Sequence, residues 1–238
     1  MGGRRGPGPH RQLPEQPFKG VTPSHFQGDP GTMGWLLPIS GDPMNDGAMK
    51  PGSPSGSEAG PVESRMVHDG RVVRLSVDQV RFPDGSVGEL ELVRHRGASA
   101  VVPMLGESDA RDPTIVLVRQ YRYAAGGFVY EIPAGIPSEG ESWEDCARRE
   151  LEEETGYVAG ELVSLTHFFT TPGFSNEVIH LFAAMGLSKG EVDRDLDEFM
   201  EVVELPLSRV LELARSGELR DGKSLVGILF ADRFFRRR

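Results

Sequence analysis

The alternation of apolar and polar positions along the chain predicts a block of strands before anything else. Residues 71–82 (RVVRLSVDQVRF) and 88–95 (GELELVRH) alternate apolar and polar side chains around the turn-forming sequence PDGS, which is typical of a β-hairpin. Residues 97–105 and 114–123 are nearly continuous β-branched and apolar runs. Such runs indicate strands that are buried on both faces.

After a further strand over residues 127–135, the apolar period changes from strand-like to helical. Ser142 is suited to the N-cap of a helix, with Asp145 three residues later as a variant of the capping box. Gly156 stands where a C-cap is expected. The apolar stripe between the caps consists of Trp143, Cys146, Ala147 and Leu151. We therefore expect an amphipathic helix over residues 142–155.

Beyond this helix, the pattern predicts three more strands and two closing helices. The expected strands cover residues 161–171, 177–187 and 200–206, and the expected helices cover residues 207–219 and 223–238. A very acidic loop, residues 189–199, precedes the last of these strands. Because strands occur both before and after a central helix, we expect an α/β (α+β) fold in which a mixed β-sheet is sandwiched between helices.

Residues 1–62 show none of this periodicity. The first 61 residues contain 13 Gly and 11 Pro, a composition that buries too little apolar surface to offset chain entropy. We therefore expect a disordered tail over residues 1–62 and one folded domain over residues 63–238. Part of the tail would be an artefact if translation started at one of the later methionines, which are Met33, Met44, Met49 and Met66.

Charge and cysteine content exclude several function classes. The formal net charge of −10 argues against general nucleic-acid binding, because phosphate backbones attract basic surfaces. An anionic substrate would need a cation or a local arginine cluster in order to bind. Cys146 is the single cysteine, so no internal disulfide can form and a reducing, cytoplasmic environment is expected. No apolar run approaches the length of a membrane span, so no membrane partner is expected.

The candidate chemistry is concentrated in the acidic stretch RRELEEETGY, residues 148–157. On a helix, Glu150, Glu153 and Glu154 stand at i, i+3 and i+4 and share one face, opposite the apolar stripe. Like charges at these spacings repel, and a bound cation would relieve the repulsion. Converging carboxylates suit a hard divalent cation such as Mg²⁺ or Mn²⁺. The alternative is an acidic helix face that contacts only solvent.

Neighbouring residues favour the metal interpretation. Glu141, just before the helix, can approach the same region, and Arg149 within the acidic run can orient one carboxylate through a bidentate pair. Glu152 is expected to face solvent. Gly135 and Gly156 bracket the whole segment at a fixed spacing.

That spacing resembles the Nudix box, G-x5-E-x7-R-E-U-x-E-E-x-G-U. Gly135, five residues, Glu141, seven residues and then the run Arg149–Tyr157 match every fixed position, with Tyr157 at the final bulky apolar position. The resemblance extends over about residues 64–235. It implies a Nudix fold and a hydrolase that acts on a nucleoside diphosphate linked to another moiety, with Mg²⁺ or Mn²⁺ as cofactor.

The resemblance also implies roles for the matched residues. Glu150 and Glu154 correspond to the principal metal ligands, Glu153 assists them, and the backbone carbonyl of Ala134 joins the metal shell. Glu141 matches the first glutamate of the box. Arg149 matches the residue that orients a catalytic carboxylate.

The sequences on either side of the box resemble the ADP-ribose pyrophosphatase branch. The strand Arg119–Arg122 resembles its substrate strand, and Pro172 stands about fifteen residues beyond the box. This implies hydrolysis of ADP-ribose or a related ADP-sugar to AMP and a sugar phosphate. The alternatives are another NDP-sugar such as GDP-mannose, a dinucleotide, or a non-catalytic nucleotide-binding module. By the same match, Arg122 and, with weaker support, Arg119 contact the substrate, unless both are ordinary exposed arginines.

Three further expectations remain open in the sequence. Glu131 is either a hydrogen-bonding residue of the substrate site or a neighbour of the metal site. The general base is expected among the acidic residues of the 191–198 loop, with Glu198 as first choice, Asp195 and Asp197 as alternatives, and Glu153 as a substitute; Leu196 departs from the branch by standing where an acid is common. Residues 63–98 exceed a minimal core of residues 99–238, and in this branch such an N-terminal antiparallel sheet forms a homodimer.

Overall fold

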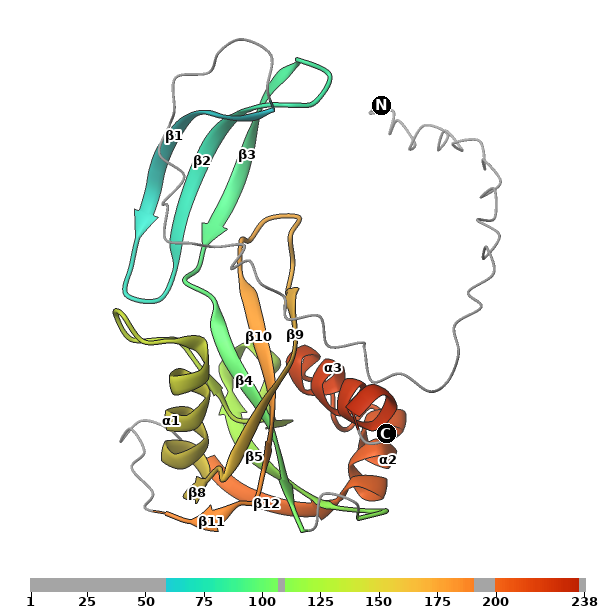
Figure 1. The fold of residues 1–238 in the computed structure, drawn as a ribbon. Helices are drawn as coiled ribbons and strands as arrows, with labels where there is room; N and C mark the ends of the chain where they lie inside the picture. The colour runs from blue at the N-terminus through green and yellow to red at the C-terminus, as the bar shows by residue number, and fades with distance from the viewer. Residues whose placement is uncertain (1–58, 107–109, 191–199, 236–238) are drawn as a thin grey trace, which may run out of the picture. The chain divides into compact units, whose positions relative to one another are not determined.

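The computed structural model describes residues 59–106, 110–190 and 200–235. Its main element is a seven-stranded mixed sheet in the order β12-β5-β4-β10-β9, with β6 added to β5 and β7 added to β4 (Figure 1). Only β4 and β10 run parallel, and the other pairs are antiparallel. The strands are β4 (Ala98–Leu105), β5 (Thr114–Arg122), β6 (Gly127–Glu131), β7 (Ala134–Gly135), β9 (Glu161–Phe169), β10 (Val178–Met185) and β12 (Met200–Pro206).

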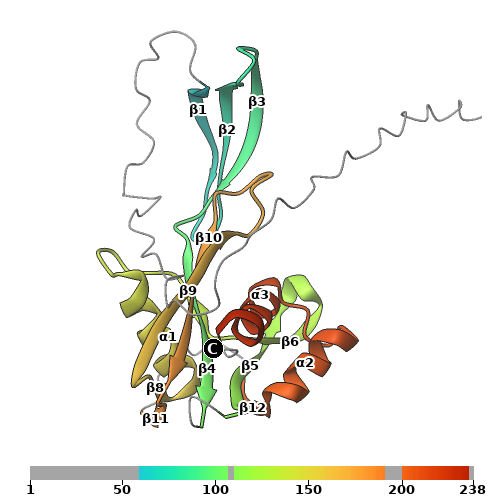
Figure 2. The ribbon, with the colours of Figure 1, turned by 45° about the vertical axis from the view of Figure 1, so that its right-hand side comes forward.

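Helices cover both faces of this sheet, which confirms the predicted sandwich. One face packs against α1 (Trp143–Thr155), and the other packs against α2 (Leu207–Ser216) and α3 (Gly222–Phe230), as the two views show (Figures 1 and 2). Alternate side chains along each central strand enter the two hydrophobic cores. In β4, Val101 faces α1, whereas Ala100, Val102 and Met104 face the closing helices. Burial on both faces is why these strands read as continuous apolar runs.

The predicted caps and stripe of α1 are confirmed. The Ser142 hydroxyl accepts a hydrogen bond from the Asp145 amide at 3.0 Å, and Gly156 adopts a left-handed conformation at the C-cap with φ of 71°. Cys146, Ala147 and Leu151 are fully buried, and burying a leucine side chain stabilises a fold by about 2 kcal/mol. The apolar stripe thereby fixes α1 on the sheet, and most of its acidic residues stand on the remaining surface, whereas Glu154 is buried.

Residues 127–135 were predicted as one strand, but they form two strands, and each pairs with a different neighbouring strand. β4 and β5 pair only at their Met104 and Ile115 ends, so the sheet opens between them farther along. The segment 131–135 fills this opening: it leaves β5 after Glu131, and then pairs with β4 as β7. Pro133 breaks the ladder because it has no N–H, although its carbonyl accepts from the Val101 amide at 2.9 Å.

A separate three-stranded antiparallel sheet precedes the core, in the order β1-β2-β3. The hairpin of β2 (Arg74–Arg81) and β3 (Val87–Arg94) confirms the sequence pattern, but β1 (Gly60–Asp69) was not predicted. Asn176 fastens the end of this sheet to the β9–β10 turn. Its side chain accepts from the His95 amide at 2.7 Å and donates to the His95 carbonyl at 3.2 Å.

Smaller differences concern short elements and helix ends. β8 (Tyr157–Val158) and β11 (Ser188–Lys189) form a two-stranded ladder that was not predicted, and η1 (Tyr123–Ala125) is a single 3₁₀ turn after β5. The last predicted helix is α3 followed by a π-helical turn over Ala231–Phe235. No helix among residues 59–106, 110–190 and 200–235 is long and apolar enough to cross a membrane.

Candidate active site

Arg149 is the centre of a cluster of carboxylates on the exposed side of α1. Its Nε and Nη2 each donate to one oxygen of Glu141, both at 2.9 Å. Its Nη1 donates to Glu150 at 2.7 Å and to Glu153 at 2.8 Å. The hydrogen bonds from Arg149 lower the pKa of Glu141, and the carboxylates in turn raise the pKa of Arg149. One guanidinium therefore holds three carboxylates in fixed positions.

Gly135 makes room for one of these carboxylates. A Cβ atom at position 135 would lie 1.9 Å from Oε1 of Glu150, far closer than any non-bonded contact allows. A side chain here would collide with the carboxylate, so Glu150 could keep its present position only if residue 135 is glycine. The first glycine of the motif and the first glutamate of its helical part are thus in direct contact.

Glu154 is oriented differently from the carboxylates that contact Arg149. Glu154 is 7% exposed, and its Oε2 accepts a hydrogen bond from the Ala134 amide at 3.3 Å. Ala134 belongs to the 131–135 segment, so the amide and carbonyl of this segment lie at the edge of the acidic cluster. Glu150 and Glu154 are both directed toward this segment, Glu150 at Gly135 and Glu154 at Ala134.

The donor chemistry fits a hard divalent cation. Among the described residues, no three His, Cys, Asp or Glu side chains are gathered as a ready-made metal cluster, since Arg149 binds three of the four carboxylates expected there. The available donors are carboxylate oxygens and the Ala134 carbonyl, with no imidazole or thiolate among them. An oxygen-only set of this kind suits Mg²⁺ or Mn²⁺ better than Zn²⁺.

A second charged cluster surrounds the buried Glu131. Arg122 donates its Nε and Nη2 to the two oxygens of Glu131 at 2.7 and 2.9 Å, and Lys223 donates to Oε2 of the same carboxylate. Burial raises the pKa of Glu131, but the hydrogen bonds and charges of Arg122 and Lys223 outweigh it, so that the pKa is lowered. Glu131 raises the pKa of Arg122, and the charge of Glu154 contributes to the same shift.

Comparison with protein families matches the NUDIX domain to residues 94–225, which is more than half of the chain. The chain belongs to the Nudix family. It is 40% identical over 171 residues to the ADP-ribose pyrophosphatase of Bacillus subtilis (strain 168), covering 71% of this chain and 90% of the relative. The methanol dehydrogenase activator of Bacillus methanolicus is equally similar, with 40% identity over 171 residues and the same coverage.

More distant matches agree with this assignment. A GDP-mannose pyrophosphatase of Klebsiella pneumoniae is 38% identical over 173 residues, covering 65% of this chain and 81% of the relative. The crystal structure of an ADP compounds hydrolase superposes with a TM-score of 0.65 at 21% identity, covering 76% of this chain and 95% of that one. At that identity the superposition shows the Nudix fold. Family membership and these pyrophosphatase relatives identify the protein as a Nudix hydrolase.

The structure separates the two arginines expected to bind substrate in this Nudix enzyme. Arg119 pairs with Glu201 at 3.0 Å, and its guanidinium carbon lies 4.5 Å above the centre of the Phe128 ring. Arg122 instead reaches Glu131 and the neighbourhood of Glu154. Of the two arginines, Arg122 is the one whose charge interacts with Glu154 of the Nudix box, and Arg119 has the contacts of a surface residue.

Cys146 and His180 have structural surroundings. Burial raises the pKa of the Cys146 thiol to about 11, and the thiol donates to the Gly135 carbonyl at 3.5 Å. A neutral, buried thiol is a poor nucleophile. His180 stacks on Trp143 with ring centroids 4.1 Å apart.

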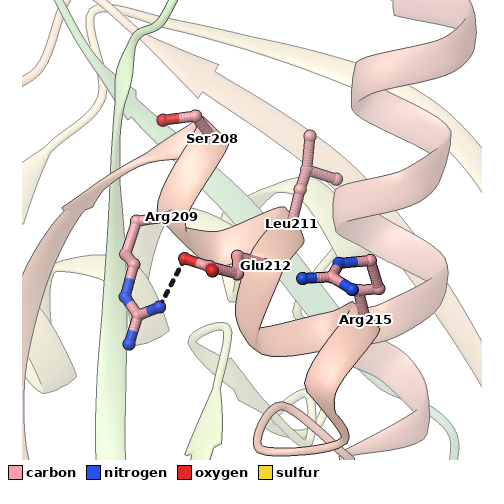
Figure 3. Close-up of a pocket in the computed structure, with 5 residues that line it drawn as sticks. All are labelled: Ser208, Arg209, Leu211, Glu212 and Arg215. Atoms are coloured by element: carbon pink, nitrogen blue, oxygen red, sulfur yellow. Dashed lines mark hydrogen bonds and ion pairs between the residues drawn. The ribbon is translucent and has the colours of Figure 1, made fainter.

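A surface hollow of about 540 Å³ lies on α2 and contains none of the Nudix box residues (Figure 3). Its lining residues are Ser208, Arg209, Leu211, Glu212 and Arg215. Arg209 and Glu212 pair with each other at 2.5 Å across it. The hollow lies on the face of the sheet opposite α1, which carries the helical part of the box.

The expected general base cannot be compared with the structure in full. Glu198, Asp195 and Asp197 lie outside the described residues. Glu153, the substitute, is described: its side chain is 40% exposed and pairs with Arg149. Arg149 thus fixes the Glu153 carboxylate while leaving part of it open to solvent.

Sequence reasoning missed Lys223, which reaches Glu131 from the first turn of α3. One signal could have identified it. A cation in the first turn of a helix opposes the helix dipole, and Lys223 stands two residues after the N-cap Asp221. An unfavourable lysine at such a position indicates a carboxylate partner from elsewhere in the fold.

Proposed function

We propose that this Nudix hydrolase cleaves the diphosphate linkage of ADP-ribose or a related ADP-sugar. Water adds across one P–O–P bridge, and the products are AMP and a sugar phosphate. The observation that carries the proposal is the Arg149-centred carboxylate cluster beside Glu154, in a chain 40% identical to an ADP-ribose pyrophosphatase. A GDP-mannose pyrophosphatase at 38% identity supports the second candidate, hydrolysis of another NDP-sugar.

The cofactor in this proposal is Mg²⁺, with Mn²⁺ as a possible substitute. Glu150 and Glu154 are the principal ligands, the Ala134 carbonyl joins them, and Glu141 is a nearby member of the set. When bound, the cation neutralises phosphate oxygens and lowers the pKa of a bound water. The space at Gly135 and the buried carboxylate of Glu154 support this assignment.

The remaining residues hold the reacting groups in place. Arg149 keeps Glu141, Glu150 and Glu153 oriented, so that little reorganisation is needed during the reaction. Arg122 binds the substrate diphosphate, because a guanidinium can grip phosphate oxygens with two parallel hydrogen bonds. Glu131 holds the edge of the Arg122 guanidinium that carries Nε and Nη2. The water loses its proton to Glu198 in the proposed scheme, or to Glu153 in its place.

We further propose a homodimer in the cytoplasm. The N-terminal sheet carries half-exposed apolar side chains, namely Val62, Met66, Val67, Val87 and Leu90, and such surface is typical of an interface. A single cysteine suits a reducing compartment. Light scattering should give twice the mass of the 26.0 kDa chain. A single-chain mass at micromolar concentration would refute the dimer.

A substrate panel tests the central proposal. ADP-ribose, GDP-mannose, NADH and diadenosine polyphosphates are incubated with enzyme and Mg²⁺, and phosphate is measured after phosphatase treatment. ADP-ribose should give the highest kcat/KM. A clear preference for GDP-mannose would support the second candidate instead, and no turnover of any member would reject both.

A further inference from the structure

Lys223 contacts a residue of the substrate site without belonging to the Nudix box. It comes from α3, on the face of the sheet opposite α1, and its Nζ donates to Glu131 and, at 3.1 Å, to Asp221. The side chain of Glu131 is 4% exposed, and that of Lys223 is 13% exposed. The ion pair is therefore largely withdrawn from water, where removing one partner has a large effect.

The Glu131 carboxylate binds two cations that differ in solvent exposure. Lys223 binds Oε2, whereas Arg122 binds both oxygens in a bidentate pair. The Arg122 side chain is 46% exposed, far more than its two neighbours. Among the described residues, only Nε and Nη2 of Arg122 have hydrogen-bond partners, which leaves Nη1 available to a ligand.

Helix α3 holds the same stretch of chain at a second point. The Ser224 hydroxyl accepts a hydrogen bond from the Ile132 amide at 2.8 Å and donates to Asp221 at 2.6 Å. The backbone at position 132 is thus fixed independently of the ion pair. Loss of Lys223 would leave the Glu131 backbone in place but free its carboxylate to follow Arg122.

We propose that Lys223 is a positioning residue for the substrate-binding guanidinium of Arg122, acting through the shared carboxylate of Glu131. Lys223 fixes the carboxylate, the carboxylate fixes the plane of the guanidinium, and the open edge of the guanidinium meets the diphosphate. The inference rests on the proposed function, since it concerns binding of that substrate. It predicts a change in substrate binding with little change in the chemical step.

The test combines Lys223→Met, Lys223→Gln and Lys223→Arg with Arg122→Ala. Steady-state kinetics with ADP-ribose and Mg²⁺ should show KM raised about tenfold by Lys223→Met, with kcat changed less than about threefold. Lys223→Arg should have a KM close to that of the unsubstituted enzyme. In the Arg122→Ala background, adding Lys223→Met should change KM by less than about twofold relative to Arg122→Ala alone.

Binding gives a readout that needs no turnover. Titration calorimetry of ADP-ribose in EDTA should show a Kd raised by about the same factor in Lys223→Met. Arg215→Met, which removes an exposed cation from α2, serves as the matched control and should leave both constants unchanged. Melting curves identify unfolded variants; Lys223→Gln replaces Lys223→Met if the latter does not fold.

Two outcomes would overturn the inference. Unchanged KM and Kd in the folded Lys223 variants would remove any role in substrate binding. An equal rise of KM in the Arg122→Ala background would show that Lys223 acts independently of Arg122. An unsubstituted enzyme that neither binds nor hydrolyses ADP-ribose would instead reject the proposed substrate and the inference together, so the two failures are distinguishable.

Discussion

The two charged clusters of this Nudix hydrolase have opposite compositions. Around Arg149, one cation contacts three carboxylates, Glu141, Glu150 and Glu153, at distances of 2.7 to 2.9 Å. Around Glu131, one carboxylate is shared by two cations, Arg122 and Lys223. In each cluster one central charge holds two or three groups of the opposite charge in position.

The difference shows how a chain with a net charge of −10 can bind an anion. The first cluster has more carboxylates than cations, so it favours a divalent cation. The second presents a half-exposed guanidinium whose other edge is fixed by a buried carboxylate. Charges held by such preorganised partners bind a ligand without first having to be oriented. We therefore propose that the first cluster, together with Glu154, binds the metal and that the second binds the diphosphate.

Loss of the Glu154 carboxylate, beside the first cluster, should have the largest effect. Glu154→Gln keeps the size of the side chain but removes the charge proposed to hold the cation. Hydrolysis should fall by about 10²–10³-fold, while circular dichroism shows an intact fold. Glu144→Gln, an exposed residue of the same helix, is the control and should retain activity. Full activity of Glu154→Gln would refute the ligand assignment.

Displacing a carboxylate without removing it should have a smaller effect. Gly135→Ala places a Cβ where Oε1 of Glu150 now lies, at 1.9 Å, so the carboxylate must move. Activity should fall about 10–100-fold, and the Mg²⁺ concentration for half activity should rise. Gly173→Ala meets no atom within 4 Å and should behave like the unsubstituted enzyme. Equal activity of the two variants would show that Glu150 needs no fixed position.

The second cluster can be tested through the pH dependence of stability. The pKa of Glu131 is lowered below its ordinary value of 4.5, so its stabilising contribution is fully present above that pH. The contribution is lost as pH falls through the folded-state pKa. The unfolding free-energy difference between wild type and Glu131→Gln should therefore be constant from about pH 6 to 8 and shrink below about pH 4.5. Urea titrations at several pH values measure it, and a difference that grows in acid would contradict the shift.

The last prediction concerns reactivity and not activity, and its subject is the thiol of Cys146, which contacts Arg149 of the first cluster. With the pKa of Cys146 raised from 9.0 to about 11, its thiolate fraction at pH 8 is about a hundredfold lower than that of a free cysteine. Iodoacetamide should therefore label the native protein at least that much more slowly than the urea-unfolded protein. Rapid labelling of the native state, detected by mass spectrometry, would show that Cys146 is accessible and acidic.

The sequence predicts the first cluster far better than the second. Glu150, Glu153 and Glu154 lie within five residues on one helix, and helical periodicity alone places them on one face. The partners of the second cluster are 9 and 92 residues apart in the chain, so only the fold brings Lys223 to Glu131. The apolar runs indicated the central strands for a similar local reason. β1 was missed because its residues are mostly exposed and give no clear pattern.

The break in the strand at Pro133 has a consequence for redesign of substrate choice. Glu131, which steadies the arginine for the diphosphate, and Gly135, which admits a carboxylate of the metal site, are opposite ends of one five-residue spacer. Its length sets the distance between the two halves of the proposed site, which bind the anion and the cation. Inserting or deleting a residue there would shift the two halves relative to each other. When substrate specificity is transferred between relatives, residues 131–135 should therefore be exchanged together.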